Sequence, residues 1–381
     1  MDESVKGLRN MALVGHGGAG KTSVAEALLF TGGVTTRLGR VDDGNTVMDF
    51  EPEEVRRKVS ISSAFHQYTW KSHRVNIIDT PGDANFFSDT RSCLQGADGA
   101  VVVIEAIDGV KVQTEQAWDL ADHFEMARLV FINKMDRERA DFFKTFKEIA
   151  DAFKPKPILV QIPIGAAENF RGVVDLVSQK AYVYGKDGKS SVGEIPPELQ
   201  DQVQSEREAL VENIAEADDA LLEKYLDGQP LTDEELEQGL RAGALARTFV
   251  PVLCGSATHD IGVDLLMDCI NVCLPSPLER GVKTGKDPDT GETAERRADP
   301  EGPFSALVFK TVADPYAGRL SVFRVFSGTL MPDSSFYNAS KETKERCGQL
   351  LQIAGKEQIA TAKAGPGDIV AVAKLKETTT G

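Results

Sequence analysis

A glycine-rich loop directly after a short apolar run is the feature that most limits how this chain can fold. The apolar run is Met11-Ala12-Leu13-Val14, and the loop extends from Gly15 to Thr22. Glycines in such a loop let backbone N–H groups approach phosphate oxygens, and the N-terminus of the following helix adds positive potential. A tight turn before a helix is the alternative explanation. We predict a phosphate-binding loop whose nucleotide-contacting residues are Gly15, His16, Gly17, Gly18, Ala19, Gly20, Lys21, Thr22 and Ser23.

Three further short motifs follow this loop in a fixed order. They are Asp79-Thr80-Pro81-Gly82, Asn133-Lys134-Met135-Asp136 and Gly255-Ser256-Ala257. Each comes directly after an apolar run that predicts a buried strand, so all three should lie at the carboxyl edge of one sheet. A β-turn could explain the first motif and a polar strand-to-helix turn the second, but neither explains the shared order. Together with the loop, they predict a site for a magnesium-bound nucleotide.

The residues expected beside the phosphates have separate roles. Lys21 would reach the β- and γ-phosphates, Thr22 would place its hydroxyl on Mg²⁺, and Asp79 would hold the ion through water. The polar segment 42–63 lies between the first two motifs, and Ser60 within it is our candidate for a further magnesium-binding hydroxyl. Such a segment is expected to become ordered when a γ-phosphate is present and disordered when it is absent.

The last two motifs predict recognition of guanine. The Asp136 carboxylate can accept two hydrogen bonds, from the N1–H and the N2 amino group of the base. Adenine lacks this pair of donors, and a buried carboxylate without partners is costly. Lys134 would stack its aliphatic stem on the base, and Ser256 and Ala257 would offer backbone N–H groups to O6. The expected nucleotide-binding residues are completed by Thr80, Pro81, Gly82, Asp83 and Asn133.

The alternation of strands and helices predicts an α/β fold with a mostly parallel sheet. It runs over residues 8–151, and we expect a helical insert at about 165–248 between two strands of the same sheet. The predicted nucleotide-binding domain covers 1–275, and a loop-like linker follows at 276–301. Residues 302–381 predict an all-β domain, a barrel, because helical periodicity is absent there. Its expected strands are 304–311, 319–326, 329–337 and 369–374.

Charge and cysteine content restrict the partners and the compartment. The net charge is −16, so the surface is poorly suited to coating a polyanion; we expect no DNA partner and only local contact with RNA. The five cysteines are scattered, and although Cys269 and Cys273 lie four apart, no second pair completes a zinc site. Free thiols are typical of a reducing compartment. The polar N-terminus and the lack of long apolar runs predict a cytoplasmic protein with no membrane partner.

The four motifs, with three runs in the all-β part, resemble the first two domains of bacterial elongation factor G. The three runs are Phe304–Lys310, Asp314–Leu320 and Arg324–Phe326, the last followed by Ser327-Gly328. The resemblance implies a GTPase that binds GTP or GDP with Mg²⁺ and acts on the ribosome. Its implied partners there are the factor-binding region, a ribosomal RNA loop and ribosomal proteins. Members of this family continue with further domains, so we expect this chain to be part of a longer protein.

The chain departs from the family pattern at the γ-phosphate. Asp83 stands where the family has the histidine that orients the attacking water, and Gly18 stands where it has aspartate. Lys58 replaces a glycine of the mobile segment, and we hypothesise that its charge substitutes for a monovalent cation. The expected catalytic residues are Lys21, Gly82 and Asp83, with slow intrinsic hydrolysis. We interpret the chain as a divergent paralogue of elongation factor G.

Two other functions stay open at this point. The altered surroundings of the γ-phosphate fit a regulatory module that binds GTP, or a guanine tetraphosphate alarmone, with little or no turnover. A phosphate-loop ATPase is the other alternative, and Asp136 argues against it because adenine offers that carboxylate no matching donor pair.

Overall fold

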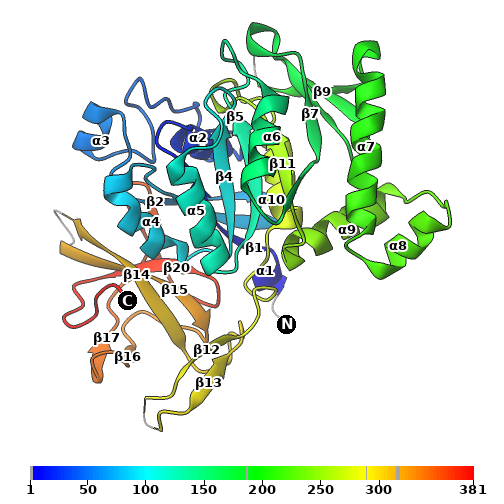
Figure 1. Ribbon diagram of the computed structural model, residues 1–381. Helices are drawn as coiled ribbons and strands as arrows, with labels where there is room; N and C mark the ends of the chain where they lie inside the picture. Colours follow the sequence, from blue (N-terminus) through cyan, green and yellow to red (C-terminus); the bar gives the residue numbers. More distant parts are fainter. Residues whose placement is uncertain (1–2, 186–187, 289, 315–317) are drawn as a thin grey trace.

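A seven-stranded sheet forms the centre of the molecule, and antiparallel sheets follow it in the chain (Figure 1). The structure, a computed structural model, describes residues 3–185, 188–288, 290–314 and 318–381. The strand order of the central sheet is β2-β3-β1-β4-β5-β11-β6, and every pair is parallel except β2 with β3. The prediction of an α/β fold with a mostly parallel sheet is therefore confirmed. Pro315, Tyr316 and Ala317 of the quoted resemblance lie outside the described residues.

Helices cover both faces of this sheet, as buried parallel strands require. All residues of β1, β4, β5 and β11 are buried, which explains their unbroken apolar sequences. The strands are β1 (Leu8–Val14), β2 (Ala64–Trp70), β3 (His73–Asp79), β4 (Gly99–Glu105), β5 (Ala127–Asn133), β6 (Lys156–Leu159) and β11 (Phe249–Cys254). The helical elements are α1 (Glu3–Lys6), α2 (Lys21–Thr31), α3 (Pro52–Arg57), η1 (Ala84–Phe86), α4 (Phe87–Leu94), α5 (Val112–His123), α6 (Phe142–Ala152), η4 (Ala257–His259) and α10 (Val263–Cys273).

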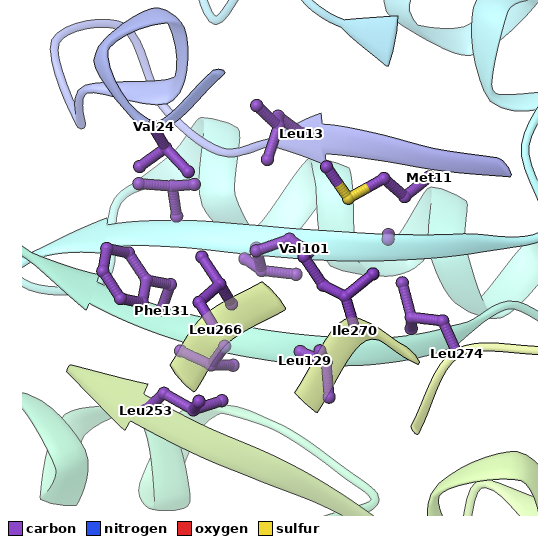
Figure 2. Packing of buried hydrophobic residues seen from close by; sticks show 14 of the residues in the cluster. Met11, Leu13, Val24, Val101, Leu129, Phe131, Leu253, Leu266, Ile270 and Leu274 are labelled. Atoms are coloured by element: carbon purple, nitrogen blue, oxygen red, sulfur yellow. The ribbon is translucent and has the colours of Figure 1, made fainter. Parts of the chain in front are cut away.

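Helix α10 packs its apolar side onto one face of the central sheet. Figure 2 shows Leu266 and Ile270 pointing toward the side chains of Val101, Leu129 and Phe131. All five side chains are fully buried. Burial of such a side chain contributes roughly 1.5–3 kcal/mol. This packing holds the carboxyl ends of β4, β5 and β11 in one rigid edge, from which the loops of the predicted site project.

The insert between β6 and β11 contains a sheet as well as the expected helices. Its helices are α7 (Gln200–Ala215), α8 (Asp219–Leu226) and α9 (Asp233–Ala246), with the short turns η2 (Ala167–Asn169) and η3 (Pro197–Leu199). Its antiparallel strands, in the order β10-β9-β8-β7, are β7 (Gln161–Ile164), β8 (Gly172–Asp175), β9 (Lys180–Tyr184) and β10 (Ser190–Gly193). These strands have only four or five residues, too few for a clear alternating pattern.

The helical spacing of Leu210, Ile214, Leu221 and Tyr225 predicts that these side chains share one buried side of the insert helices, and this prediction is only partly correct. Leu210 and Ile214 are buried, whereas Leu221 is half-buried and Tyr225 is 37% exposed. The reason is the position of α8, which lies at the outer edge of the insert and packs mainly along α7 (Figure 1). The helical spacing was correct, but an outer helix has a neighbour along only part of its length.

The C-terminal part is an antiparallel β domain, as predicted. Its main sheet has the order β14-β15-β20-β18-β19, and β16 pairs with β17 separately; closure into a barrel stays a prediction. The strand predicted at 329–337 begins too early in the prediction. The observed strand, β16, begins only at Ser335, because Pro332 and the left-handed Asp333 precede it. The predicted loop 276–301 contains the hairpin β12–β13 (Lys283–Lys286 and Thr293–Arg296). The other strands are β14 (Ser305–Asp314), β15 (Gly318–Ser327), β16 (Ser335–Asn338), β17 (Thr343–Arg346), β18 (Leu350–Ala354), β19 (Glu357–Thr361) and β20 (Ile369–Ala373).

The β domain is joined to the central sheet through buried contacts. Phe309 of β14 packs edge-on against Phe65 of β2, with ring centroids 5.8 Å apart. Arg324 of β15 forms a buried ion pair of 2.7 Å with Asp98, which also accepts a hydrogen bond from the Asn10 side chain. A buried ion pair tolerates little displacement, so the two parts have a defined orientation. Among the helices of the described residues, none combines the length and the apolar character needed to cross a membrane.

Candidate nucleotide site

The four sequence motifs meet at the carboxyl edge of the central sheet. Asn133, at the end of β5, donates from Nδ2 to the Ala19 carbonyl at 3.0 Å and accepts the Ala257 N–H at 3.1 Å. Thr80 donates its hydroxyl to the Leu13 carbonyl at 2.7 Å, which connects the second motif to the strand before the first. Loops after β1, β3, β5 and β11 therefore surround one space, the position where open α/β sheets bind ligands.

The phosphate-binding loop wraps around the ammonium group of Lys21. Lys21 Nζ donates to the carbonyls of Gly15 and His16, at 3.1 and 2.9 Å, and the side chain is buried. Gly15 has φ +137°, and a Cβ there would lie 2.3 Å from the Val103 carbonyl oxygen. Burial lowers the pKa of Lys21, and the nearby Asp79 opposes this shift. A phosphate in the loop would supply the negative charge that such a buried cation needs.

His16 takes part in the site through its backbone, because its side chain points toward α5. Its Nδ1 lies 3.2 Å from Thr114 Oγ1, and its Nε2 lies 3.8 Å from Glu105. The neighbouring His16 ring, followed by the Lys134 ammonium group, keeps the pKa of Glu105 well below its usual range. Lys134 Nζ donates to Glu105 Oε2 at 2.6 Å. This ion pair fixes the aliphatic stem that was predicted to stack on the base.

The remaining loop residues differ in exposure. Gly17 and Gly18 are exposed, and no atom of the described ranges lies within 4 Å of a Cβ built on Gly18. Ala19 is buried, and Gly20 has a left-handed φ of 94° at the start of α2. Ser23 is half-buried in the first turn of α2. Their backbone groups line the start of the helix, which is the part of such a loop that faces an anion.

The three residues predicted to hold a metal lie side by side. Thr22 Oγ1 donates to Asp79 Oδ2 at 2.7 Å and lies 3.0 Å from Ser60 Oγ. The other Asp79 oxygen, Oδ1, is buried and has no hydrogen-bond partner among the described residues. Burial, followed by the charge of Asp49, raises the pKa of Asp79. A divalent cation would remove this penalty, and hydroxyl and carboxylate oxygens are the ligands that Mg²⁺ prefers, so the residues present fit the ion.

Asp49 joins this cluster and was missed by the sequence analysis. It is 3% exposed, and within the part of the chain that the structure describes its Oδ2 has no hydrogen-bond partner. Burial raises its pKa, while the nearby hydroxyls of Ser60 and Thr22 oppose the rise. The sequence offered several carboxylates between 42 and 54, and nothing in the pattern distinguished this one. Only the folding of segment 42–63 against α2 identifies it.

The predicted base-recognition residues are also adjacent. Asp136 Oδ1 accepts the Ser256 hydroxyl at 2.6 Å, and its Oδ2 lies 3.6 Å from His259 Nδ1. Ser256 and Ala257 are buried after β11. The sequence analysis assigned only backbone groups to Ser256, so the orienting role of its hydroxyl is an additional finding. These contacts hold the carboxylate in one orientation.

The predicted catalytic residues occupy different surroundings. Gly82 lies against the phosphate loop, where a Cβ would come within 2.3 Å of Lys21 Nζ. Asp83 begins the turn η1, and its Oδ1 accepts both the Asn85 backbone N–H at 2.8 Å and the Asn85 side chain at 2.7 Å. Pro81 is buried, and its backbone carbonyl accepts a hydrogen bond from the Thr90 hydroxyl. The Asp83 carboxylate is thus engaged as a helix cap.

Lys58 does not contact the phosphate loop in this conformation through any hydrogen bond or ion pair within the described ranges. Its side chain is exposed at the end of α3, and its backbone is left-handed, with φ 56°. The hypothesis that its charge substitutes for a cation therefore stays a prediction.

Comparison with known proteins agrees with this geometry. Residues 6–276 match the family described as Elongation factor Tu GTP binding domain, and residues 303–381 match Elongation factor G domain 2. The chain belongs to the elongation factor Tu and elongation factor G family of GTPases. A crystal structure of a protein from Thermus thermophilus is similar, with 32% sequence identity and a TM-score of 0.86. The match covers 98% of this chain and 53% of that one, so this chain spans about half the length of its structural relative.

Proposed function

We propose that this GTPase-family chain binds and hydrolyses GTP as a molecular switch on the ribosome, in the manner of elongation factor G. The observation that carries the proposal is the convergence of Thr22, Ser60, Asp79 and Asp49 beside the phosphate loop. Ser60 belongs to the segment expected to respond to the γ-phosphate, so its approach to Thr22 gives the site a means of sensing that group.

Magnesium would be held by the hydroxyls of Thr22 and Ser60, with Asp79 and Asp49 binding its water molecules. When bound, the ion neutralises charge on the β- and γ-phosphates. The unpartnered buried oxygens of Asp79 and Asp49 support this assignment. The orienting bond from Ser256 to Asp136 supports guanine as the base.

Hydrolysis would depend on positioning and electrostatics, because phosphoryl transfer to water needs little covalent chemistry from the protein. Lys21 would stabilise charge on the transferred group, and the Gly82 N–H would bind a γ-phosphate oxygen. Asp83 occupies the water-orienting position, but its carboxylate caps η1 through Asn85. This engagement supports a low intrinsic rate and a divergent paralogue within the family.

The ribosome as partner, with its factor-binding region, and a cytoplasmic location are part of the same proposal. They rest on the family match and on the β domain that follows the GTPase domain. They belong to the proposal because the match spans about half of the structural relative.

Single-turnover hydrolysis of bound GTP, with and without purified ribosomes, tests the proposal. We expect slow turnover of the chain alone and stimulation by ribosomes in the longest form of the protein. Competition with ATP should leave bound GTP in place. Replacement Asp83→His should raise the stimulated rate, and Asp83→Asn, which can still cap η1, should not. Failure to bind guanine nucleotides would refute the proposal.

A regulatory module with little or no turnover is the second candidate. The capping contact of Asp83 and the open surroundings of Gly18 favour it, because neither residue provides a free group beside the γ-phosphate. Tight GTP binding without turnover in either condition would establish this alternative.

A further inference from the structure

A cavity of about 690 Å³ lies at the end of the central sheet that is opposite the nucleotide site. Arg9 of β1 and His73 of β3 line it, and both residues stand near the amino ends of their strands, whereas the nucleotide motifs follow the carboxyl ends. Helix α1 lies at the same end, beside the start of β1 (Figure 1). Helix α9 and the end of α10 complete the walls. The volume lies within the range of roughly 300–1,000 Å³ that is typical of small-molecule sites.

Arg9 places a buried positive charge in the wall of this cavity. The side chain is 2% exposed, and its guanidinium group donates to the backbone carbonyls of Lys6, Leu8 and Asn271, over distances of 2.7 to 3.3 Å. Carbonyls orient the group but carry no net charge, and no carboxylate of the described residues forms an ion pair with it. Burial lowers the pKa of Arg9 to about 10, and the charge of Glu279 opposes this shift. Because a buried cation without a paired anion is costly, an anionic group in the cavity would stabilise it.

Lys6 and His73 add to the positive character of this wall. Lys6 is exposed at the end of α1, and the part of the chain that the structure describes offers its ammonium group no ion-pair partner. Burial lowers the pKa of His73, and the charges of Arg9 and Arg241 lower it further. The shift at His73 therefore reflects a positive potential on the side of the cavity formed by α1, β1 and β3.

Helix α9 supplies negative charge to the same cavity. Glu234, Glu237 and Arg241 follow one another at intervals of three and four residues, so they lie on one side of the helix, and all three line the cavity. Arg241 is neutralised by its ion pair with Glu279. Glu234 and Glu237 are exposed, and neither pairs with a cation in the described ranges. The carboxylates of α9 and the cations of α1 and β1 thus face one cavity without neutralising each other.

Asn271, near the end of α10, adds a polar group without a partner. The residue is 7% exposed, and its Nδ2 donates to the Trp70 carbonyl at 3.1 Å. Its Oδ1 is buried and accepts no hydrogen bond from any residue that the structure describes. A buried acceptor without a donor is costly. An N–H group of a molecule in the cavity would remove this cost.

We propose that this cavity binds a short peptide with free ends, its carboxylate beside Lys6 and Arg9 and its ammonium group beside Glu234 and Glu237. Such a peptide carries one charge of each sign, separated by a chain whose amide N–H groups can serve Asn271 Oδ1. A pure anion or a pure cation matches the cavity less well, because it leaves one set of charged side chains without a partner. The site shares no residue with the nucleotide site, and its occupation requires no guanine nucleotide.

Three forms of one peptide test the proposal. Tetra-alanine with free ends, its N-acetylated form and its C-amidated form would each be titrated into the chain, and backbone amide shifts in NMR spectra would report binding. We expect saturable shifts around Arg9 and Arg241 with the free peptide. Removal of either terminal charge should weaken binding about fivefold, the upper range for an exposed ion pair. Equal affinity for the three forms, or no saturable shifts with free tetra-alanine, would overturn the proposal.

Variants at exposed positions assign each end of the peptide. The double variant Glu234→Gln with Glu237→Gln should abolish the preference for the free peptide over its N-acetylated form. Lys6→Gln should instead reduce the preference over the C-amidated form. Glu115→Gln on α5 and Lys147→Gln on α6 remove exposed charges away from the cavity, so they are the matched controls.

The ratios between peptide forms distinguish direct contact from a general disturbance of the fold. A disturbed cavity would weaken all three forms equally, whereas loss of a contacting charge changes only the preference that depends on it. Equal weakening in the cavity variants, or the same change in the controls, would overturn the assigned contacts. Guanine nucleotide binding plays no part in these measurements, so they decide this proposal independently of the proposed GTPase function.

Discussion

The Ser256 hydroxyl donates a 2.6 Å hydrogen bond to the Asp136 carboxylate, although the two residues are 120 positions apart in the chain. Ser256 follows β11 and Asp136 follows β5, two neighbouring parallel strands. The bond holds the carboxylate in one orientation. We therefore expect affinity for guanine to depend on the Ser256 side chain, which does not itself need to touch the nucleotide.

Ser256→Ala should weaken the binding of both GTP and GDP by about tenfold. A hydrogen bond to a charged group contributes roughly 1.5–3 kcal/mol, and its loss also frees the carboxylate to rotate. Fluorescent nucleotide titration would measure the change. Thr258→Ala, in the same turn, is the control and should have little effect. Unchanged affinity in Ser256→Ala would mean that Asp136 is oriented by other groups.

Asp49→Asn should raise the Mg²⁺ concentration needed for GTP binding by about tenfold. The substitution removes one of the buried carboxylate charges near Thr22 and leaves the side-chain volume unchanged. Binding of a GTP analogue during a magnesium titration would measure it. Asp43→Asn, at an exposed position of the same segment, should behave like the unmodified chain. Identical titrations of the two variants would exclude Asp49 from the metal site.

Lys58→Gly should stabilise the folded chain by about 1 kcal/mol. Lys58 ends α3 with φ 56°, a conformation that costs a residue with a Cβ roughly 1–2 kcal/mol and that glycine adopts freely. Urea denaturation would measure the free energy of unfolding. Lys58→Ala removes the same charge but keeps the Cβ, so it should give no such gain. Destabilisation by glycine would indicate that the lysine side chain has a structural partner.

Asp260→Asn should stabilise the fold at pH 8 more than at pH 5. Burial raises the pKa of Asp260 to about 6, and the Thr31 hydroxyl donates to its Oδ1, a bond that asparagine can keep. The folded-state pKa of Asp260 lies above the unfolded value of 3.8. The contribution of this residue to the free energy of unfolding is therefore fully present below pH 3.8 and is lost as the pH rises through 6. We expect the difference between the two pH values to reach about 1 kcal/mol. A pH-independent difference would contradict the raised pKa.

The elements best predicted from sequence are those with long, unambiguous patterns. The apolar runs of β1, β4, β5 and β11 are buried on both faces, so nearly every position carries the same signal. The short strands of the insert, the hairpin β12–β13 and strand β17 were not anticipated. Each has only four or five residues, and their pairing is set by neighbours that local sequence does not reveal.

The sequence by itself determined the motifs and the sheet edge at which they meet, because the glycines and the polar residues after buried strands act locally. Only the tertiary structure decided which other groups complete the site. Asp49 reaches Thr22 through the folding of a segment without periodic pattern. Such contacts depend on how separately folded elements pack, and no local sequence pattern encodes that packing.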